Sequence, residues 1–345
     1  MSGPNLQADC SQKLCWQRLA LHRAWRILAH GWLLVLLCLG SAASASEGDR
    51  VLTAIAASPH VYYFQGEAGM ASASNQGFMS NAGFVVTDDG VVVFDSLGSP
   101  ALGAAMITAI RKITPVPIKR VIVSHYHADH IYGLQAFKAI GADIWAHQNG
   151  QAYLNSDVAA ARLAERRVSL FPWVDDKTRV IAADKWLNFS RHKFIRFTMG
   201  GIRFQLIDVS GAHSDEDIMM FVEDDALLFA GDLYFTGRIP FVGNANSRAW
   251  LTALDHMLEV KPKIVIPGHG AKSTDPGADL RLTKEYLTYL RKVMGAAVND
   301  MTGFEDAYAK VDWRKFAAYP AFAQANRLNA FGTYILMEQE SLEKK

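Results

Sequence analysis

The sequence predicts a mixed α/β fold built in layers, and three observations support this prediction. Pairs of short apolar runs that resemble hairpins come first, alternating strand and helix patterns follow, and the chain ends in helical sequence. Clusters of histidine and aspartate follow short apolar strands, which is where α/β folds place their sites. Half of the 345 residues are hydrophobic and 20% are charged, so the chain has enough apolar mass for a sizeable core.

Residues 1–45 have the pattern of a secretory leader. Basic side chains are followed by the apolar run 32–39 and by small residues at the spacing of a leader peptidase site, so cleavage is expected before Ser46. The alternative is an uncleaved anchor, but the apolar run is well short of the ~20 residues that a spanning helix needs. We therefore expect a periplasmic or secreted protein with no stable membrane span after cleavage.

All three cysteines, Cys10, Cys15 and Cys38, lie in this leader. The mature protein is therefore expected to have no disulfide and no thiol nucleophile, and any metal must be held by histidine and carboxylate. The formal net charge is +1, and it becomes slightly negative without the leader. No basic excess remains to neutralise phosphates, which argues against nucleic acid and favours a small-molecule substrate. The sequence leaves the oligomeric state open.

The first half of the mature chain begins with strands. A strand is predicted near residues 60–66, and two more flank the turn at 88–90 as a hairpin. Residues 100–113 have helical periodicity, and two prolines follow soon after their end. The next predicted elements are a short buried strand at 121–123, a histidine-rich loop, a helix at 131–140, a strand at 142–147, and mostly helix and loop over 149–190.

The second half alternates strands and helices before it becomes helical. Predicted here are two strands about Gly200-Gly201, two strands about the turn at 223–225, an amphipathic helix at 247–260, a strand at 263–270 and mainly helix over 271–345. We expect residues 46–345 to form a single domain whose C-terminal part is helical.

Residues 124–130 read SHYHADH and place four potential metal ligands within six residues, directly after a buried strand. A chance grouping on a surface loop explains this poorly, and imidazole with carboxylate suits Zn(II), Mn(II) or Fe(II). Further histidines and aspartates follow other predicted strands, at Asp208, His213, Asp232 and His269. The remaining isolated histidines are expected to be ordinary core or surface residues: His60, His147, His192 and His256.

This pattern resembles the metallo-β-lactamase superfamily over roughly residues 61–272. The motif His-x-His-x-Asp-His is met by His125, His127, Asp129 and His130, and the later motifs follow in order at His213, Asp232 and His269. The resemblance implies an αββα sandwich with a site on one edge of the sheets, and two zinc ions per chain. It implies a first metal held by His125, His127 and His213, a second held by Asp129, His130 and His269, and a bridge between them at Asp232.

The residues themselves agree with that allocation. Two cations close together repel, and a shared carboxylate with a shared hydroxide offsets the repulsion. Metal binding lowers the pKa of water toward ~7, so no separate strong base is required. Asp129 is expected to be catalytic, because it can orient the hydroxide and then pass a proton to the leaving group.

With an aspartate at position 232, the ligand set resembles that of the glyoxalase II, lactonase and general hydrolase branches of the superfamily. It differs from that of the lactamases that have a thiolate ligand at this position. The run 231–257 is similar to that of periplasmic quinoprotein relay system zinc metallohydrolases. The favoured function is an exported metal-dependent hydrolase of an ester, thioester, lactone or β-lactam-type bond. The alternatives are an iron-dependent dioxygenase of the same fold that acts on a sulfur substrate, and a non-catalytic metal or redox accessory protein.

Some polar residues near these motifs have two interpretations. Arg238, Asn244 and Arg248 follow Asp232 and can line a pocket, or Asn244 and Ser247 can simply turn the chain and cap the next helix. Asn81 can reach the metal edge or only shape a turn.

Overall fold

The computed structural model describes residues 50–343. The expected leader at 1–45 and the cleavage site before Ser46 lie outside these residues, so both stay predictions. Within the described range, no helix combines the length and the apolar character that crossing a membrane requires.

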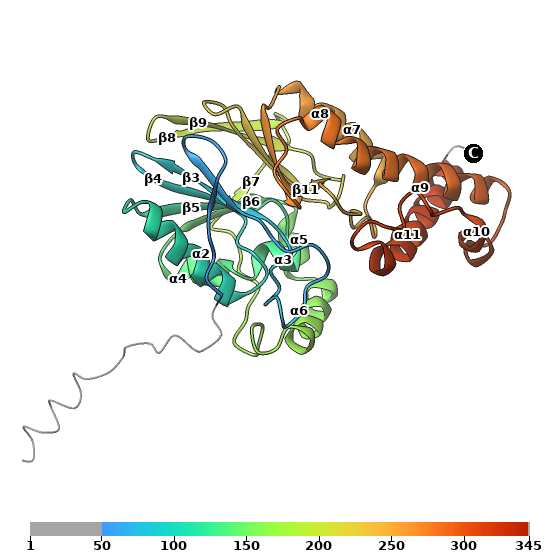
Figure 1. Cartoon of the computed structure of the whole chain (residues 1–345), viewed down its shortest axis with the longest axis horizontal. Helices are drawn as coiled ribbons and strands as arrows, with labels where there is room; N and C mark the ends of the chain where they lie inside the picture. The colour runs from blue at the N-terminus through green and yellow to red at the C-terminus, as the bar shows by residue number, and fades with distance from the viewer. Residues whose placement is uncertain (1–49, 344–345) are drawn as a thin grey trace, which may run out of the picture. The chain divides into compact units, whose positions relative to one another are not determined.

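Two β-sheets form the centre of the fold, and each is made of strands that are consecutive along the chain (Figure 1). The seven strands of the first sheet follow one another in space as they do along the chain. Strands β1 to β4 pair antiparallel, and strands β4 to β7 pair parallel. The strands are β1 (Ile55–Ala56), β2 (Val61–Phe64), β3 (Ala82–Thr87), β4 (Gly90–Phe94), β5 (Ile118–Ile122), β6 (Asp143–His147) and β7 (Lys185–Leu187).

The second sheet has five strands in the order β12-β11-β10-β9-β8. Strand β12 is parallel to β11, and the other neighbours pair antiparallel. The strands are β8 (Phe194–Met199), β9 (Ile202–Asp208), β10 (Ile218–Val222), β11 (Leu227–Phe235) and β12 (Ile264–His269).

Helices cover the outer face of each sheet, which gives the αββα layers that the resemblance implied. Buried residues of α2, α3 and α4 form one core with the first sheet, and α7, α9, α10 and α11 form another with the second. The helices are α2 (Pro100–Ile113), α3 (Ala128–Ile131), α4 (Leu134–Ala139), α5 (Gly150–Leu154), α6 (Asp157–Ser169), α7 (Ser247–Glu259), α8 (Pro276–Asp279), α9 (Arg281–Asn299), α10 (Phe304–Lys310) and α11 (Phe322–Glu343).

The apolar runs of the sequence are explained by burial on both faces of a sheet. In β4, Val92 and Phe94 belong to the core between the sheets, whereas Val91 and Val93 belong to the core under the helices. Side chains alternate across a strand, so a strand covered on both faces is apolar throughout. The sequence consequently shows β4 as an unbroken hydrophobic run.

The predicted helix at 131–140 is wrong in its bounds, because the structure has two short helices, α3 and α4, separated near Gly133. A Cβ at Gly133 would lie 1.8 Å from the carbonyl oxygen of Ser96. The Gly133 amide donates to the carbonyl oxygen of Leu97 at 3.1 Å. This close approach holds the chain against the loop after β4, so the helix does not continue.

Asp232 lies inside a strand rather than after one, because β11 continues through it to Phe235. His269 is the last residue of β12, inside the strand predicted at 263–270. The pairing of β11 with β12 shifts register on both sides of Gly231, whose φ is 53°. Side chains of a regular strand point alternately to the two faces of the sheet, and a bulge of this kind changes the direction of the side chain that follows it. Here that side chain is Asp232.

Candidate metal centre

The structure brings all seven predicted ligands together at one edge of the two sheets. They form two groups, and within each group the candidate ligand atoms lie within 4.8 Å of one another. The first group is His125, His127, His213 and Asp232, and the second is Asp129, His130 and His269.

The carboxylate of Asp232 lies between the two groups. Its Oδ1 is 3.1 Å from His130 Nε2 and 3.2 Å from His269 Nε2. Its Oδ2 faces the first group, 3.6 Å from His213 Nε2. One oxygen thus faces each group, which is the arrangement a bridging ligand needs.

The remaining ligand atoms also converge within each group. Nε2 of His213 lies 3.1 Å from Nδ1 of His127. In the second group, Oδ2 of Asp129 lies 3.3 Å from His269 Nε2 and 3.6 Å from His130 Nε2. The side chain of Asp129 is partly exposed, whereas that of His269 is fully buried.

Several of these atoms are buried without a hydrogen-bond partner. They are Nε2 of His125, Nε2 of His130, Nε2 of His269 and Oδ1 of Asp232. A buried polar atom left unpaired costs free energy, and one metal ion in each group would satisfy these atoms. The donor set of imidazole nitrogens and carboxylate oxygens therefore fits a pair of divalent ions.

The electrostatics of the two groups point the same way. Burial, followed by the charge of neighbouring histidines, lowers the pKa of His125, and burial lowers the pKa of His213 to about 3. Both are therefore neutral imidazoles at neutral pH, the form that binds metal. Burial also opposes protonation of His130, but the charges of Asp232 and Asp129 outweigh it and raise its pKa. The second group thus favours a positive charge at its centre.

The sequence model of the metallo-β-lactamase superfamily matches residues 75–269, more than half of the chain. The chain belongs to the metallo-β-lactamase superfamily. The resemblance in the sequence implied this family and the αββα layers, and both expectations are confirmed.

Among similar proteins, a metallo-β-lactamase type 2 of Bacillus sp. (strain 170) is 28% identical over 60% of this chain and 70% of its own. A linear primary-alkylsulfatase of Pseudomonas sp. (strain ATCC 19151) is 20% identical over 59% of this chain and 44% of its own.

Solved structures show the same fold. An inverting sec-alkylsulfatase from Pseudomonas sp. aligns with a TM-score of 0.65 at 16% identity, over 82% of this chain and 50% of that one. A metallo-β-lactamase from Pontibacter korlensis aligns with a TM-score of 0.52 at 19% identity, over 69% of this chain and 99% of its own. The chain therefore spans about half the length of the alkylsulfatases that it resembles.

One residue of this superfamily member that the sequence analysis overlooked is Asp95, which follows β4. Its Oδ2 accepts from His130 Nδ1 at 2.8 Å and from Ser124 Oγ at 2.8 Å. Its Oδ1 accepts from the Ser124 amide at 2.7 Å. Because the Ser124 hydroxyl gives its hydrogen to Asp95, it is left to accept from His125 Nδ1 at 2.9 Å. Both histidines then present Nε2 to the centre.

The backbone of Asp95 supports a functional role. Its φ is 61°, a left-handed conformation that residues other than glycine rarely adopt. The signal in the sequence is an aspartate directly after the apolar run of β4, the same placement that Ser124 and His125 have after β5. A lone aspartate in that position is also an ordinary turn residue, so the sequence did not distinguish it.

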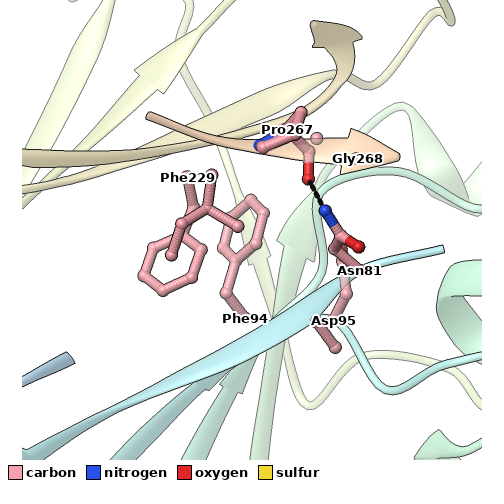
Figure 2. Close-up of a pocket in the computed structure, with 9 residues that line it drawn as sticks. Asn81, Phe94, Asp95, Phe229, Pro267 and Gly268 are labelled. Atoms are coloured by element: carbon pink, nitrogen blue, oxygen red, sulfur yellow. Dashed lines mark hydrogen bonds between the residues drawn. The ribbon is translucent and has the colours of Figure 1, made fainter. Parts of the chain in front are cut away.

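Asn81, directly before β3 of the first sheet, bonds to the backbone of β12 in the second sheet (Figure 2). Its Nδ2 donates to the carbonyl oxygens of Pro267 and Gly270, both at 2.8 Å, and its amide donates to Gly268 at 2.7 Å. Asn81 and Asp95 also line the same small pocket. The side chain therefore holds the end of β12, and with it His269, rather than serving as a ligand.

Of the polar residues that follow Asp232, some cap a helix or form an ion pair, and one lies against a predicted metal ligand. Asn246, not Asn244 or Ser247, caps α7 by accepting from the amides of the next turn. Arg248 pairs with Glu340 of α11, so its charge is already compensated. Arg238, in contrast, is 1% exposed and lies against His269.

The remaining polar candidates lie outside both groups. Asp208 pairs with Lys193 at 3.0 Å and faces His147 Nε2 at 3.6 Å. His60 pairs with Asp225 at 3.1 Å, and His256 is exposed on α7. In the part of the chain that the structure describes, none of these isolated histidines joins a metal-binding group, as the sequence analysis expected.

Proposed function

We propose that this protein is an exported hydrolase with two metal ions, zinc by preference, that cleaves an ester, thioester, lactone or β-lactam-type bond of a small molecule. The observation that carries the proposal is the placement of Asp232, with one carboxylate oxygen toward each group of ligands. A single-metal protein has no need of such a bridge. Membership of a superfamily of metallohydrolases supports the proposal.

The first group would hold one metal and the second group the other, with Asp232 shared between them. When bound, such a pair supplies Lewis acidity that makes water nucleophilic at neutral pH and stabilises a leaving anion. The chain itself supplies Asp129, whose carboxylate is the partly exposed one of the centre. Asp129 orients the attacking water and takes up its proton, which it then returns to the leaving group.

Metal analysis and a substrate panel test this function. The purified protein is expected to hold two equivalents of metal and to hydrolyse at least one member of a panel comprising a cephalosporin, a thioester, a lactone, a phosphodiester and an alkyl sulfate. The alkyl sulfate belongs in the panel because alkylsulfatases are among the similar proteins. Bound iron with oxygen uptake and no hydrolysis would instead identify the dioxygenase alternative.

Export is a separate part of the proposal and rests on the leader pattern of residues 1–45. Mass spectrometry of the protein from a cell-envelope fraction should show a chain that starts at Ser46. Soluble cytoplasmic protein that retains residues 1–30 would contradict it.

A further inference from the structure

The C-terminal helix α11 holds the chain segment between β11 and α7, residues 236–246, which is called the β11–α7 loop below. The side chain that holds it is Asn329, which is 1% exposed. Its Oδ1 accepts from the amides of Val242 and Gly243, at 2.8 and 3.3 Å. Its Nδ2 donates to the carbonyl oxygen of Pro240 at 2.8 Å. Three hydrogen bonds from one side chain thus fix the backbone of this loop.

The amide of Asn329 is used completely, and the same helix meets the loop again at Gly332. The second Nδ2 hydrogen of Asn329 goes to the Tyr286 hydroxyl of α9 at 3.0 Å, so both donor and both acceptor positions are filled. A Cβ at Gly332 would lie 1.8 Å from the carbonyl oxygen of Gly243. Glycine is a poor residue in a helix interior, and this close approach explains its place in the middle of α11. Two independent features of α11 therefore fit the loop.

The β11–α7 loop lies against one predicted ligand of the second group and beside one of the first. The ring of Phe241 meets the ring of His269 edge-on at 6.2 Å. At the other end of the loop, the Asn246 amide donates to the carbonyl oxygen of Ala212 at 3.0 Å, directly before His213. The loop therefore covers the centre on the side of the second sheet.

We propose that Asn329 is a positioning residue that holds the β11–α7 loop closed and so limits the access of small molecules to the bound metals. The inference rests on the proposed two-metal centre, but not on hydrolysis of a particular bond. Asn329 touches no predicted ligand and acts through the loop. Helix α11 lies outside residues 75–269, which the family model matches, so this control of access is a property of the C-terminal helical part.

Asn326 provides the matched control. It is the same residue type on the same helix, one turn earlier, and is also 1% exposed. Its Oδ1 accepts from the Tyr286 hydroxyl at 2.8 Å, and its Nδ2 donates to the Tyr308 hydroxyl at 3.0 Å. Both of these bonds stay among the C-terminal helices. Asn326→Leu and Asn329→Leu thus remove the same buried amide from one network, but only Asn329→Leu releases the loop.

Gly332→Ala is a second test that removes no hydrogen-bonding group. Its added methyl group must push the carbonyl oxygen of Gly243 away, while alanine favours the helix. Gly295→Ala in α9 is its control, because a Cβ there meets the flexible end of Met337 and no part of the loop.

The experiment measures how fast a chelator in excess removes cobalt(II) from the metal-loaded, full-length mature protein. The visible absorption of cobalt reports both its release and the geometry of its ligands. We expect at least about 10-fold faster release from Asn329→Leu and from Gly332→Ala, because the bonds that oppose loop opening are lost or strained. Asn326→Leu and Gly295→Ala should release metal at the wild-type rate. Before the chelator is added, every variant should show the wild-type spectrum, since no ligand is removed.

Thermal melting separates loop opening from general destabilisation. Asn326→Leu and Asn329→Leu should lower Tm alike, because each leaves buried polar partners unpaired. Three results overturn the inference: wild-type release from Asn329→Leu, equal acceleration in Asn326→Leu, or an altered cobalt spectrum in Asn329→Leu. If Asn329→Leu does not fold, Gly332→Ala decides, and release at the wild-type rate from that variant overturns the inference.

Failure of the hydrolysis proposal has a different signature. In that case no substrate of the panel is cleaved, while the rate of metal release still depends on Asn329.

Discussion

Gly268 lies against the carboxylate of Asp232 so closely that a Cβ at position 268 would stand 2.0 Å from Asp232 Oδ1. The two residues occupy adjacent parallel strands, β12 and β11. Only a residue without a side chain leaves room for the carboxylate between the two ligand groups. A packing requirement in one strand thus fixes the position of a ligand in its neighbour.

Gly268→Ala should therefore displace Asp232. We expect metal affinity to fall by about 10- to 100-fold, the range for residues that orient ligands. Overpacking should also cost about 1–3 kcal/mol of stability. Equilibrium dialysis with metal analysis checks the first effect and thermal melting checks the second. Gly303→Ala is the control, because a Cβ at Gly303 meets nothing within 4 Å. Wild-type metal affinity in Gly268→Ala would show that Asp232 does not depend on this contact.

Asp232→Ala should remove the bridge and leave the fold intact. Two cations without a shared carboxylate repel one another, so we expect metal retention to fall by at least about 10- to 100-fold, because a direct ligand matters more than an orienting residue. Circular dichroism should remain that of the wild type. Titration with zinc tests the premise as well: if the wild type saturates at one metal per chain, the assignment of two metals is wrong.

Asp129→Asn should abolish turnover and keep much of the bound metal. Asparagine retains the shape and one oxygen but cannot take up a proton, and a positioned acid or base contributes about 10²–10⁴-fold. We expect kcat to fall at least about 100-fold. The first metal should remain, because His125, His127 and His213 do not depend on Asp129.

The control for this change is Asp215→Asn, at an exposed position in the loop that carries His213. It should leave kcat unaltered. Full activity in Asp129→Asn with both metals present would mean that Asp129 only shapes its turn, since asparagine makes the same turn.

Asp95→Asn should weaken both metal positions, although Asp95 is not a ligand. Asparagine presents an NH₂ group where one carboxylate oxygen now accepts, so either His130 Nδ1 or Ser124 loses its acceptor. We expect metal affinity to fall by about 10- to 100-fold. Competition with a coloured chelator measures this affinity, and an unchanged value would exclude an orienting role for Asp95.

Removal of the metals should lower thermal stability. Ligand binding stabilises the folded state by about 2.7 kcal/mol when free ligand is 100 times Kd, which corresponds to roughly 5 °C in Tm for a chain of this size. A melt in a strong chelator should show this decrease, and added zinc should reverse it. If Tm stays the same after complete removal of metal, the two groups do not bind it in the folded protein.

The layered fold and the ligand motifs could be predicted because their signals are local. Ser99 caps α2 and Pro100 begins it. Hydrophobic periodicity and these helix-start residues together predict the helix at the bounds that the structure shows. Strand β7 was not predicted, because its three residues carry no pattern of their own and become a strand only by pairing with β6.

The residues that support the metal ligands could not be predicted from the sequence, for a related reason. The role of Gly268 depends on Asp232, which lies 36 positions earlier in the sequence, and the role of Asp95 depends on His130 and Ser124. Such contacts are set by which strands become neighbours, and no short window of sequence contains them. Arg238 is similar: its type is visible in the sequence, but its burial against His269 is a property of the folded chain.

The two sheets divide the chain into consecutive halves, with the division between Leu187 and Phe194. Each ligand group draws on both halves: His125, His127, Asp129 and His130 come from the first, and His213, Asp232 and His269 from the second. Bound metal ions would therefore link two polypeptide segments that could be made as separate fragments. Co-expressed halves cut between these strands should reassemble in the presence of zinc and come apart when it is chelated, which would turn the centre into a metal-controlled split protein.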